Sequence, residues 1–190
     1  MTEDVTVLVI IRGNSGSGKT TTAREVRRRY GRGCALIEQD HLRRVILREH
    51  GGNGDDAVAP GFIVATVRAA LDAGYHVVLE GILHTGQYGE PLRRLAGDTA
   101  AACFYMDVSF DETVRRHFRR EEPIPVTAET MRGWYTERDL LGVPGEVVVP
   151  ETATFEQTVT TVLRDSGLSA APPQTPCPAR CHHCAGSPPL

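Results

Sequence analysis

The sequence contains almost no lysine. Lys19 is the single lysine among its 21 basic residues, and all the others are arginine. A long apolar run is also missing from the N-terminal region, where residues 5–11 are far fewer than the roughly 20 residues that a membrane-spanning helix needs. An excess of charge is absent as well. The net charge of −3 argues against a protein that binds nucleic acid through a general basic surface, although a local basic groove is compatible with it.

The N-terminal segment lacks the features of a signal peptide. Residues 1–14 have neither a positively charged start nor a small-residue cleavage site. We therefore expect a cytoplasmic protein without membrane association, whose five cysteines are reduced. The hydrophobic content of 41% and the charged content of 24% suit one globular domain. No pattern in the sequence indicates an oligomeric state.

The loop that contains Lys19 has the strongest pattern in the chain. Residues 12–26, RGNSGSGKTTTAREV, follow a β-branched apolar run and contain the spacing Gly-x4-Gly-Lys-Thr. A loop between a strand and a helix directs backbone N–H groups at an anion, and the helix N-terminus adds positive potential. We expect Lys19 to contact the outer phosphates of a nucleoside triphosphate and the Thr20 hydroxyl to bind Mg²⁺. The predicted nucleotide-binding residues of this loop are Gly13, Asn14, Ser15, Gly16, Ser17, Gly18, Lys19, Thr20 and Thr21.

The survival of one lysine at this position fits the same interpretation. A compact ammonium group between phosphates cannot be replaced by a broad planar guanidinium, whereas most surface lysines can. The same count excludes the Asn-Lys-x-Asp segment expected of GTPases, because no second lysine exists to supply it.

Strand and helix patterns alternate along the chain. The predicted strands cover residues 5–13, 34–39, 75–81, 101–108 and 146–149, and the predicted helices cover 20–31, 41–52, 61–74, 110–120, 127–142 and 154–164. Ser109 with Glu112, and Thr154 with Gln157, predict capping boxes. Such alternation predicts an α/β fold with a five-stranded, mainly parallel sheet covered by helices on both faces.

The chain divides into a domain and a tail. We expect residues 1–166 to form the domain and residues 167–190, rich in proline, to form a tail. The tail holds a Cys/His cluster, CPARCHHC at residues 177–184. Its spacing could ligate Zn²⁺, but a structural zinc site draws ligands from two separated segments. A tail with adventitious metal affinity is the simpler interpretation.

Asp40 follows the second predicted strand. Parallel sheets bind ligands at the carboxyl ends of their strands, so Asp40 should face the same crevice as the phosphate-binding loop. A carboxylate there can accept the proton of an attacking hydroxyl group. The alternative is a helix N-cap, a position that aspartate favours. Arg43 and Arg44 stand three and four residues further on, and we expect them to contact the substrate from the same side of the following helix.

Together with the loop, the segment IEQDHLRR at residues 37–44 resembles small P-loop kinases. This group includes adenylylsulfate kinase, zeta-toxin-type nucleotide-sugar kinases, chloramphenicol phosphotransferase and the kinase part of polynucleotide kinase. The resemblance covers roughly residues 5–165 and implies a three-layer P-loop NTPase fold with a short lid. It also implies Mg²⁺-dependent transfer of the γ-phosphoryl group of ATP to a hydroxyl of a small molecule, which could be a metabolite, a nucleotide-like compound or an antibiotic. In several members the corresponding aspartate is regarded as the general base, and we carry this role to Asp40.

The lid implied by the resemblance is short, at about residues 119–127. In kinases of this type, lid arginines stabilise the transferring phosphoryl group, and Arg116 and Arg120 are our candidates. The alternative is a solvated basic helix face. We expect Val114 and Phe118 to pack inward.

Other candidates lie after the third strand and after the lid. Glu80 is a candidate for holding a Mg²⁺-bound water or a substrate hydroxyl, and His84 for contacting the substrate, unless it is an ordinary loop histidine. Arg138 could contact the nucleotide or form a structural pair with Glu137 or Asp139. Trp134 and the adjacent tyrosine are expected to pack, and no adenine pocket can be assigned.

Two other functions remain open from the sequence. One is a 5′-hydroxyl kinase acting on nucleic acid ends, which would need a basic groove extending beyond Arg43 and Arg44. The other is a nucleotide-binding regulator with little turnover, for which Asp40 would be dispensable.

Overall fold

The computed structural model describes residues 6–49, 58–119 and 125–171. Its centre is a five-stranded sheet in the order β2-β3-β1-β4-β5, and all four strand pairs are parallel. The strands are β1 (Val7–Gly13), β2 (Cys34–Glu38), β3 (His76–Gly81), β4 (Ala100–Asp107) and β5 (Val147–Pro150). The α/β fold predicted from the alternating patterns is confirmed.

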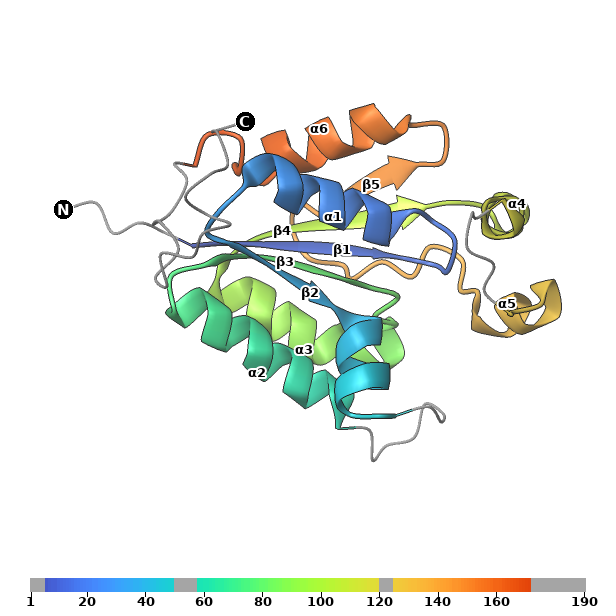
Figure 1. Cartoon of the computed structure of the whole chain (residues 1–190), viewed down its shortest axis with the longest axis horizontal. Coiled ribbons are helices and arrows are strands. Elements are labelled where there is room, and N and C mark those ends of the chain that lie inside the picture. Colours follow the sequence, from blue (N-terminus) through green and yellow to red (C-terminus); the bar gives the residue numbers. More distant parts are fainter. Residues whose placement is uncertain (1–5, 50–57, 120–124, 172–190) are drawn as a thin grey trace, which may run out of the picture.

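Helices cover both faces of the sheet, giving three layers (Figure 1). Helices α1 (Lys19–Tyr30) and α6 (Phe155–Asp165) lie on one face, and α2 (Ala59–Asp72) and α3 (Thr85–Asp98) on the other. Leu8 and Ile10 of β1 pack against α2 and α3, whereas Val9 and Ile11 pack against α1 and α6. This double burial explains why β1 is a continuous apolar run rather than an alternating one.

Helix ends agree with the local sequence signals at two of three places. Helix α1 ends at Gly31, and Thr154 with Gln157 forms the complete capping box at the start of α6. At helix α4 (Phe110–Phe118), the Ser109 hydroxyl accepts the N–H of Glu112, but the reciprocal bond is missing. The Glu112 carboxylate pairs with arginines of its own helix, and the Ser109 N–H donates to Glu151 at 2.9 Å. The predicted capping box at Ser109 is therefore only half formed.

Three helix predictions were wrong or incomplete. Helix α3 was not predicted at all, although Tyr88, Leu92 and Leu95 form its buried face. The segment predicted as an α-helix from residue 41 is a π-helix, η1 (His41–Ile46). Helix α5 (Ala128–Trp134) is shorter than predicted, and Arg138 lies beyond it with a φ of 45°.

Helix α4 buries a different face from the predicted one. Thr113 and His117 are buried, whereas Phe118 is 64% exposed. Thr113 faces inward because the phosphate-binding loop approaches the α4 backbone there, and the His117 Nε2 lies 3.1 Å from the Val126 carbonyl oxygen. The prediction that Phe118 packs inward is therefore wrong, whereas Val114 is half-buried.

The folded unit continues past the predicted boundary at residue 166. Leu168 is 1% exposed and packs in the core with α1 and α6, and the Ser169 N–H donates to the Leu163 carbonyl. The cysteine cluster of the tail lies outside the described residues, so its zinc affinity stays untested. Among the helices of the described ranges, none combines the length and the apolar character needed to cross a membrane.

Candidate active site

The loop between β1 and α1 forms a tight cradle at the carboxyl edge of the sheet. Gly16 has a φ of +84°, and a Cβ atom there would stand 2.5 Å from the Thr113 carbonyl oxygen. The Ser17 N–H closes the turn on the Asn14 carbonyl at 3.1 Å, and Gly18, in the left-handed conformation, precedes α1. Only glycine fits at position 16, because the loop packs directly against the α4 backbone.

The Asn14 side chain ties this loop to the segment after α5. Its Oδ1 accepts the Thr136 N–H at 3.0 Å, and its Nδ2 donates to the Thr136 carbonyl at 2.9 Å. Asn14 is 4% exposed, so this pairing fixes the base of the loop. Among the predicted nucleotide-binding residues, Asn14 thus faces the protein with its side chain, and its carbonyl accepts a hydrogen bond from Lys19 Nζ at 3.2 Å.

A cavity of about 720 Å³ lies over the start of α1. Lys19, Thr20, Asp40 and Glu80 all line it, so the four residues that the sequence predicted separately share one space. The Thr20 hydroxyl lies 3.1 Å from both carboxylate oxygens of Glu80. The Glu80 side chain is buried, and this burial raises its pKa, although Lys19 and the Thr20 hydroxyl act in the opposite direction.

The Asp40 carboxylate does not cap the helix that follows it. Asp40 occupies the N-cap position of η1, but its side chain accepts no backbone N–H there. It pairs instead with Arg44, whose Nε lies 3.3 Å from Oδ1, and the carboxylate side chain is 66% exposed. The alternative interpretation as a simple N-cap is therefore wrong, and the acid faces the open side of the site.

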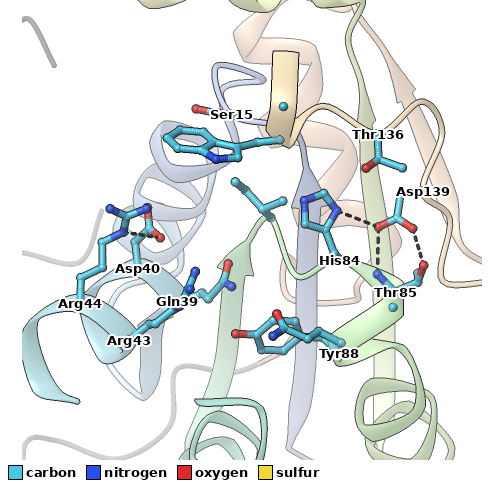
Figure 2. A pocket seen from close by; sticks show the side chains of 15 residues that line it. Ser15, Gln39, Asp40, Arg43, Arg44, His84, Thr85, Tyr88, Thr136 and Asp139 are labelled. Carbon is cyan, nitrogen blue, oxygen red and sulfur yellow. Dashed lines mark hydrogen bonds and ion pairs between the residues drawn. The ribbon is translucent and has the colours of Figure 1, made fainter. Parts of the chain in front are cut away.

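A second cavity of about 590 Å³ adjoins the first (Figure 2). Arg43, Arg44 and His84 line it, together with Gln39 and Tyr88. Five residues line both cavities and so mark the boundary between them: Ser15, Asp40, Arg44, Ile82 and Trp134. The three predicted substrate-side residues Arg43, Arg44 and His84 thus meet in one space, which Asp40 connects to the phosphate-binding loop.

An ion-pair network that the sequence did not predict holds Asp139, which lines this second cavity. The Arg12 guanidinium is fully buried and donates to the Leu83 carbonyl from Nε at 3.1 Å and from Nη2 at 2.9 Å. Its Nη2 also lies 2.9 Å from the Asp139 carboxylate. Burial lowers the pKa of Arg12, while Asp139 and Glu146 oppose the shift. A buried arginine inside an apolar strand is a signal of such a network, because a buried charge needs a partner.

A third cavity of about 270 Å³ adjoins the loop at Ser17 and Gly18. Thr21 and Arg116 line it with Pro150 and Phe155, at the junction of β5 and α6. The Arg116 guanidinium donates to the Ser17 carbonyl at 3.1 Å and to the Glu151 carbonyl at 3.2 Å, and it pairs with Glu112. Arg116 therefore faces this smaller cavity, which no sequence pattern indicated.

A family model described as an AAA domain matches residues 8–137. The match runs from β1 through the phosphate-binding loop, Asp40 and α4 to the end of α5, which is more than half of the chain. The chain belongs to this family.

Solved structures share the fold of this AAA-domain protein at low sequence identity. A gluconokinase from Sinorhizobium meliloti is 19% identical with a TM-score of 0.62, covering 88% of this chain and 94% of the other. An APS kinase from Mycobacterium tuberculosis, in complex with AMPPNP and APS, is 18% identical with a TM-score of 0.67, covering 86% and 98%. A tunicamycin resistance protein from Deinococcus radiodurans is 19% identical with a TM-score of 0.61, covering 88% and 99%. These likenesses confirm the P-loop kinase fold.

No curated protein matches the sequence of this AAA-domain protein.

The remaining predicted residues lie around the segment between α4 and β5. Arg138 lies 3.7 Å from the Asp107 carboxylate, so its observed partner is neither Glu137 nor Asp139. Arg120 lies outside the described residues. Of the two aromatic residues expected to pack, Tyr135 contacts the Phe110 ring edge-to-face, whereas Trp134 is 38% exposed and lines both large cavities.

Proposed function

We propose that this protein is a kinase that transfers the γ-phosphoryl group of ATP to a hydroxyl group of a small molecule, with Mg²⁺ as cofactor. One observation carries the proposal: the Asp40 carboxylate borders both the cavity of Lys19 and Thr20 and the cavity of Arg43 and His84. An acid at such a border can receive the proton of a hydroxyl group that enters from one side and attacks a phosphate held on the other.

The phosphate-binding loop supplies the nucleotide contacts in this proposal. Its backbone N–H groups and the N-terminus of α1 attract phosphate oxygens, and Lys19 Nζ can move from the Asn14 carbonyl, 3.2 Å away, to a phosphate. We assign the nucleotide base to the third cavity, beside Arg116, because this cavity adjoins Ser17 and Gly18 of the loop. Its walls combine Pro150 and Phe155 with a guanidinium that can lie against a flat ring.

The donor set beside the loop fits Mg²⁺. The Thr20 hydroxyl and the Glu80 carboxylate lie within 3.1 Å of each other and offer the oxygen ligands that Mg²⁺ prefers. When bound there, Mg²⁺ would neutralise charge on the β- and γ-phosphate oxygens. Glu80 accepts a hydrogen bond from the Thr20 hydroxyl, which turns the lone pairs of that oxygen outward.

The acceptor occupies the 590 Å³ cavity in this proposal. Asp40 orients its hydroxyl group and takes up the proton, and Arg44 holds that carboxylate in place at 3.3 Å. Arg43 and His84 contact the rest of the acceptor. Arg120 remains our proposed source of positive charge from the lid, whereas the contacts of Arg116 suit the nucleotide side better than the transferring group.

The experiment measures Mg²⁺-dependent ADP formation from ATP with a panel of acceptors. The panel contains D-gluconate, D-glucose, adenosine 5′-phosphosulfate, tunicamycin and a 5′-hydroxyl oligonucleotide, with a no-acceptor control. We expect one of the small molecules to raise ADP formation well above that control. Turnover with the oligonucleotide alone, falling steeply with salt, would point to a nucleic acid kinase instead. No acceptor-dependent turnover would leave a nucleotide-binding regulator as the better description.

Two substitutions then test the assigned roles. Lys19→Ala should abolish turnover, and Asp40→Asn should lower kcat by about 10²–10⁴-fold, the usual contribution of a general base. Asp98→Asn is the matched control, because Asp98 also pairs with an arginine, Arg68 at 2.6 Å, but on the outer surface of α2 and α3. Equal rates for Asp40→Asn and Asp98→Asn would remove Asp40 from the mechanism.

A further inference from the structure

His84 occupies the corner of the acceptor cavity where β3 leads into α3. Its Nδ1 lies 3.6 Å from the Asp139 carboxylate, and its side chain is 30% exposed. Figure 2 shows one ring nitrogen turned to Asp139 and the rest of the ring turned towards the side where Asp40 and Arg44 lie. The pair is somewhat longer than a hydrogen bond, and a shift of about 0.6 Å would close it.

Asp139 is held much more rigidly than the histidine that it faces. Its carboxylate accepts the Thr85 N–H at 3.0 Å and also accepts a hydrogen bond from the Thr85 hydroxyl. Because Thr85 is the first residue of α3, Asp139 caps this helix from another segment of the chain. Burial acts to raise the pKa of Asp139, but the Thr85 hydrogen bonds and the Arg12 charge outweigh it and lower the pKa. The carboxylate is therefore ionised and fixed.

Arg12 is the buried anchor of this arrangement. It lies fully buried at the end of β1, where it binds Asp139 and also the carbonyl of Leu83. Leu83 has a φ of 47°, an unfavourable conformation for a leucine, and the hydrogen bonds to its carbonyl help to hold it there. Strain of this kind persists only where the surroundings fix it. Arg12 thus sets the path of the turn that presents His84 to the cavity.

We infer that Asp139, anchored by Arg12 and Thr85, positions His84 so that its Nδ1 carries the proton and its Nε2 accepts a hydrogen bond from a hydroxyl of the acceptor. This inference rests on the proposed function and deepens it. A neutral imidazole has one donor and one acceptor nitrogen, and a carboxylate beside Nδ1 selects the tautomer whose proton lies there. The lone pair of Nε2 is then free to accept a hydrogen bond from a hydroxyl group of the acceptor.

The inferred acceptor class follows from this lone pair and from the position of Asp40 on another segment around the same cavity. Asp40 and His84 lie on different elements around one cavity of about 590 Å³, after β2 and after β3. One hydroxyl group is oriented by Asp40, so the hydroxyl at His84 is a second one. The acceptor is therefore a polyhydroxyl compound, of the sugar or sugar-acid type, rather than a simple alcohol.

The first experiment needs no acceptor. Long-range ¹H–¹⁵N NMR spectra of the full chain, recorded without nucleotide at a pH of about 8.5, where an ordinary histidine is neutral, report which ring nitrogen carries the proton. The His84 signals are assigned from the spectrum of His84→Gln. We expect the Nδ1–H tautomer in the parent, a mixture of tautomers in Asp139→Asn, and parent spectra in Asp98→Asn. A parent with the Nε2–H tautomer, or an Asp139→Asn spectrum identical to the parent, would overturn the inference.

The second experiment uses the acceptor found in the panel and a set of its deoxy analogues. Each analogue lacks one hydroxyl group other than the one that is phosphorylated. Losing one hydrogen bond costs about 0.5–1.5 kcal/mol, so we expect the KM for the acceptor to rise about 2- to 12-fold in Asp139→Asn, with a smaller change in kcat. Asp139→Asn should also lose the parent's discrimination against one deoxy analogue, whereas Asp98→Asn should keep it. His84→Gln, which can still accept a hydrogen bond, should retain more of the parent's acceptor affinity than His84→Ala.

The outcomes separate this inference from the function on which it rests. A panel without any turnover refutes the kinase proposal, and the polyhydroxyl acceptor falls with it, whatever the tautomer of His84. Turnover with an unchanged acceptor KM in both Asp139→Asn and His84→Ala refutes the positioning role alone. Equal use of every deoxy analogue refutes the second hydroxyl contact.

Discussion

Replacing Gly16 with alanine tests the geometry of the phosphate-binding loop directly. Gly16 has a φ of +84°, and a Cβ atom at this position would lie 2.5 Å from the Thr113 carbonyl oxygen and 3.2 Å from its carbonyl carbon. The obstacle is backbone of α4 rather than the end of a flexible side chain. The substitution therefore has to displace either the loop or the helix.

The expected cost has two parts. The left-handed conformation costs an alanine about 1–2 kcal/mol. Relieving a backbone clash inside a packed site costs about 1–3 kcal/mol more. The sum for Gly16→Ala is about 2–5 kcal/mol, and for a chain of this length it lowers Tm by about 4–20 °C.

Gly167→Ala is the matched control for backbone strain without a clash. Gly167 has a φ of +80°, nearly that of Gly16, and no atom of the described residues lies within 4 Å of the position that a Cβ atom would take there. It follows α6, far along the chain from the phosphate-binding loop. We expect a cost of about 1–2 kcal/mol, hence a Tm lowered by about 2–8 °C, with nucleotide binding unchanged.

Thermal unfolding followed by circular dichroism measures stability, and calorimetric titration with AMPPNP and Mg²⁺ measures binding. Gly16→Ala should lose at least about tenfold in affinity, since a loop displacement that costs about 1.4 kcal/mol of binding free energy suffices. The reasoning would be refuted if Gly16→Ala bound AMPPNP like the parent and unfolded at the same temperature as Gly167→Ala. The loop would then not rest against α4.

Three further predictions concern single side chains. Burial raises the pKa of Glu80 above its ordinary value of 4.5, so protonation of Glu80 favours the folded state. The stabilisation from this protonation is complete below pH 4.5 and is lost as the pH rises through the folded-state pKa. In the absence of Mg²⁺ and nucleotide, Glu80→Gln should therefore be more stable than the parent at a pH of about 7 and lose this advantage near a pH of about 4, as denaturant titrations at both pH values would show. Arg116→Gln should raise the KM for ATP, whereas Arg115→Gln, which loses only its exposed pair with Glu112, should not. Burial raises the thiol pKa of Cys34 to about 12 and of Cys103 to about 11, so both should resist maleimide at a pH of about 7.5 until denaturant is added, which peptide mass spectrometry can follow.

Local sequence patterns predicted the parts of the site that lie close together along the chain. The phosphate-binding loop and α1 form one continuous segment, so the spacing of Gly13 to Thr20 determines their geometry. Asp40 was predictable because it ends a strand of a parallel sheet, whose strand ends meet at one edge. The same rule brought Glu80 to this edge, and only its direct contact with the Thr20 hydroxyl needed the structure.

Contacts between distant segments were not predictable in the same way. The Arg12–Asp139 pair joins residues 127 positions apart, and nothing near either residue indicates the other. Helix α3 escaped prediction because Pro91 and several glycines weaken its local signal, and tertiary burial of Tyr88, Leu92 and Leu95 compensates. On α4, the close approach of the loop decided which face is buried, which the spacing of Val114 and Phe118 cannot reveal.

The charged side chains that line the cavity of about 720 Å³, beside Lys19 and Thr20, indicate what else the proposed phosphoryl transfer requires. Counting histidines as neutral, its lining has three cationic and three anionic side chains, and Arg24 is already paired with Glu38 at 2.6 Å. The cations are Lys19, Arg24 and Arg44, and the anions are Glu38, Asp40 and Glu80. A cavity so nearly balanced offers little net attraction for a triphosphate, since the Coulomb terms of its side chains largely cancel. The loop amides contribute partial charges only, so in the proposed reaction the remaining positive charge would have to come from Mg²⁺ beside Thr20 and from a lid arginine. If the protein is the kinase proposed above, we therefore expect the binding of ATP itself, and not only the transfer step, to depend on the metal ion.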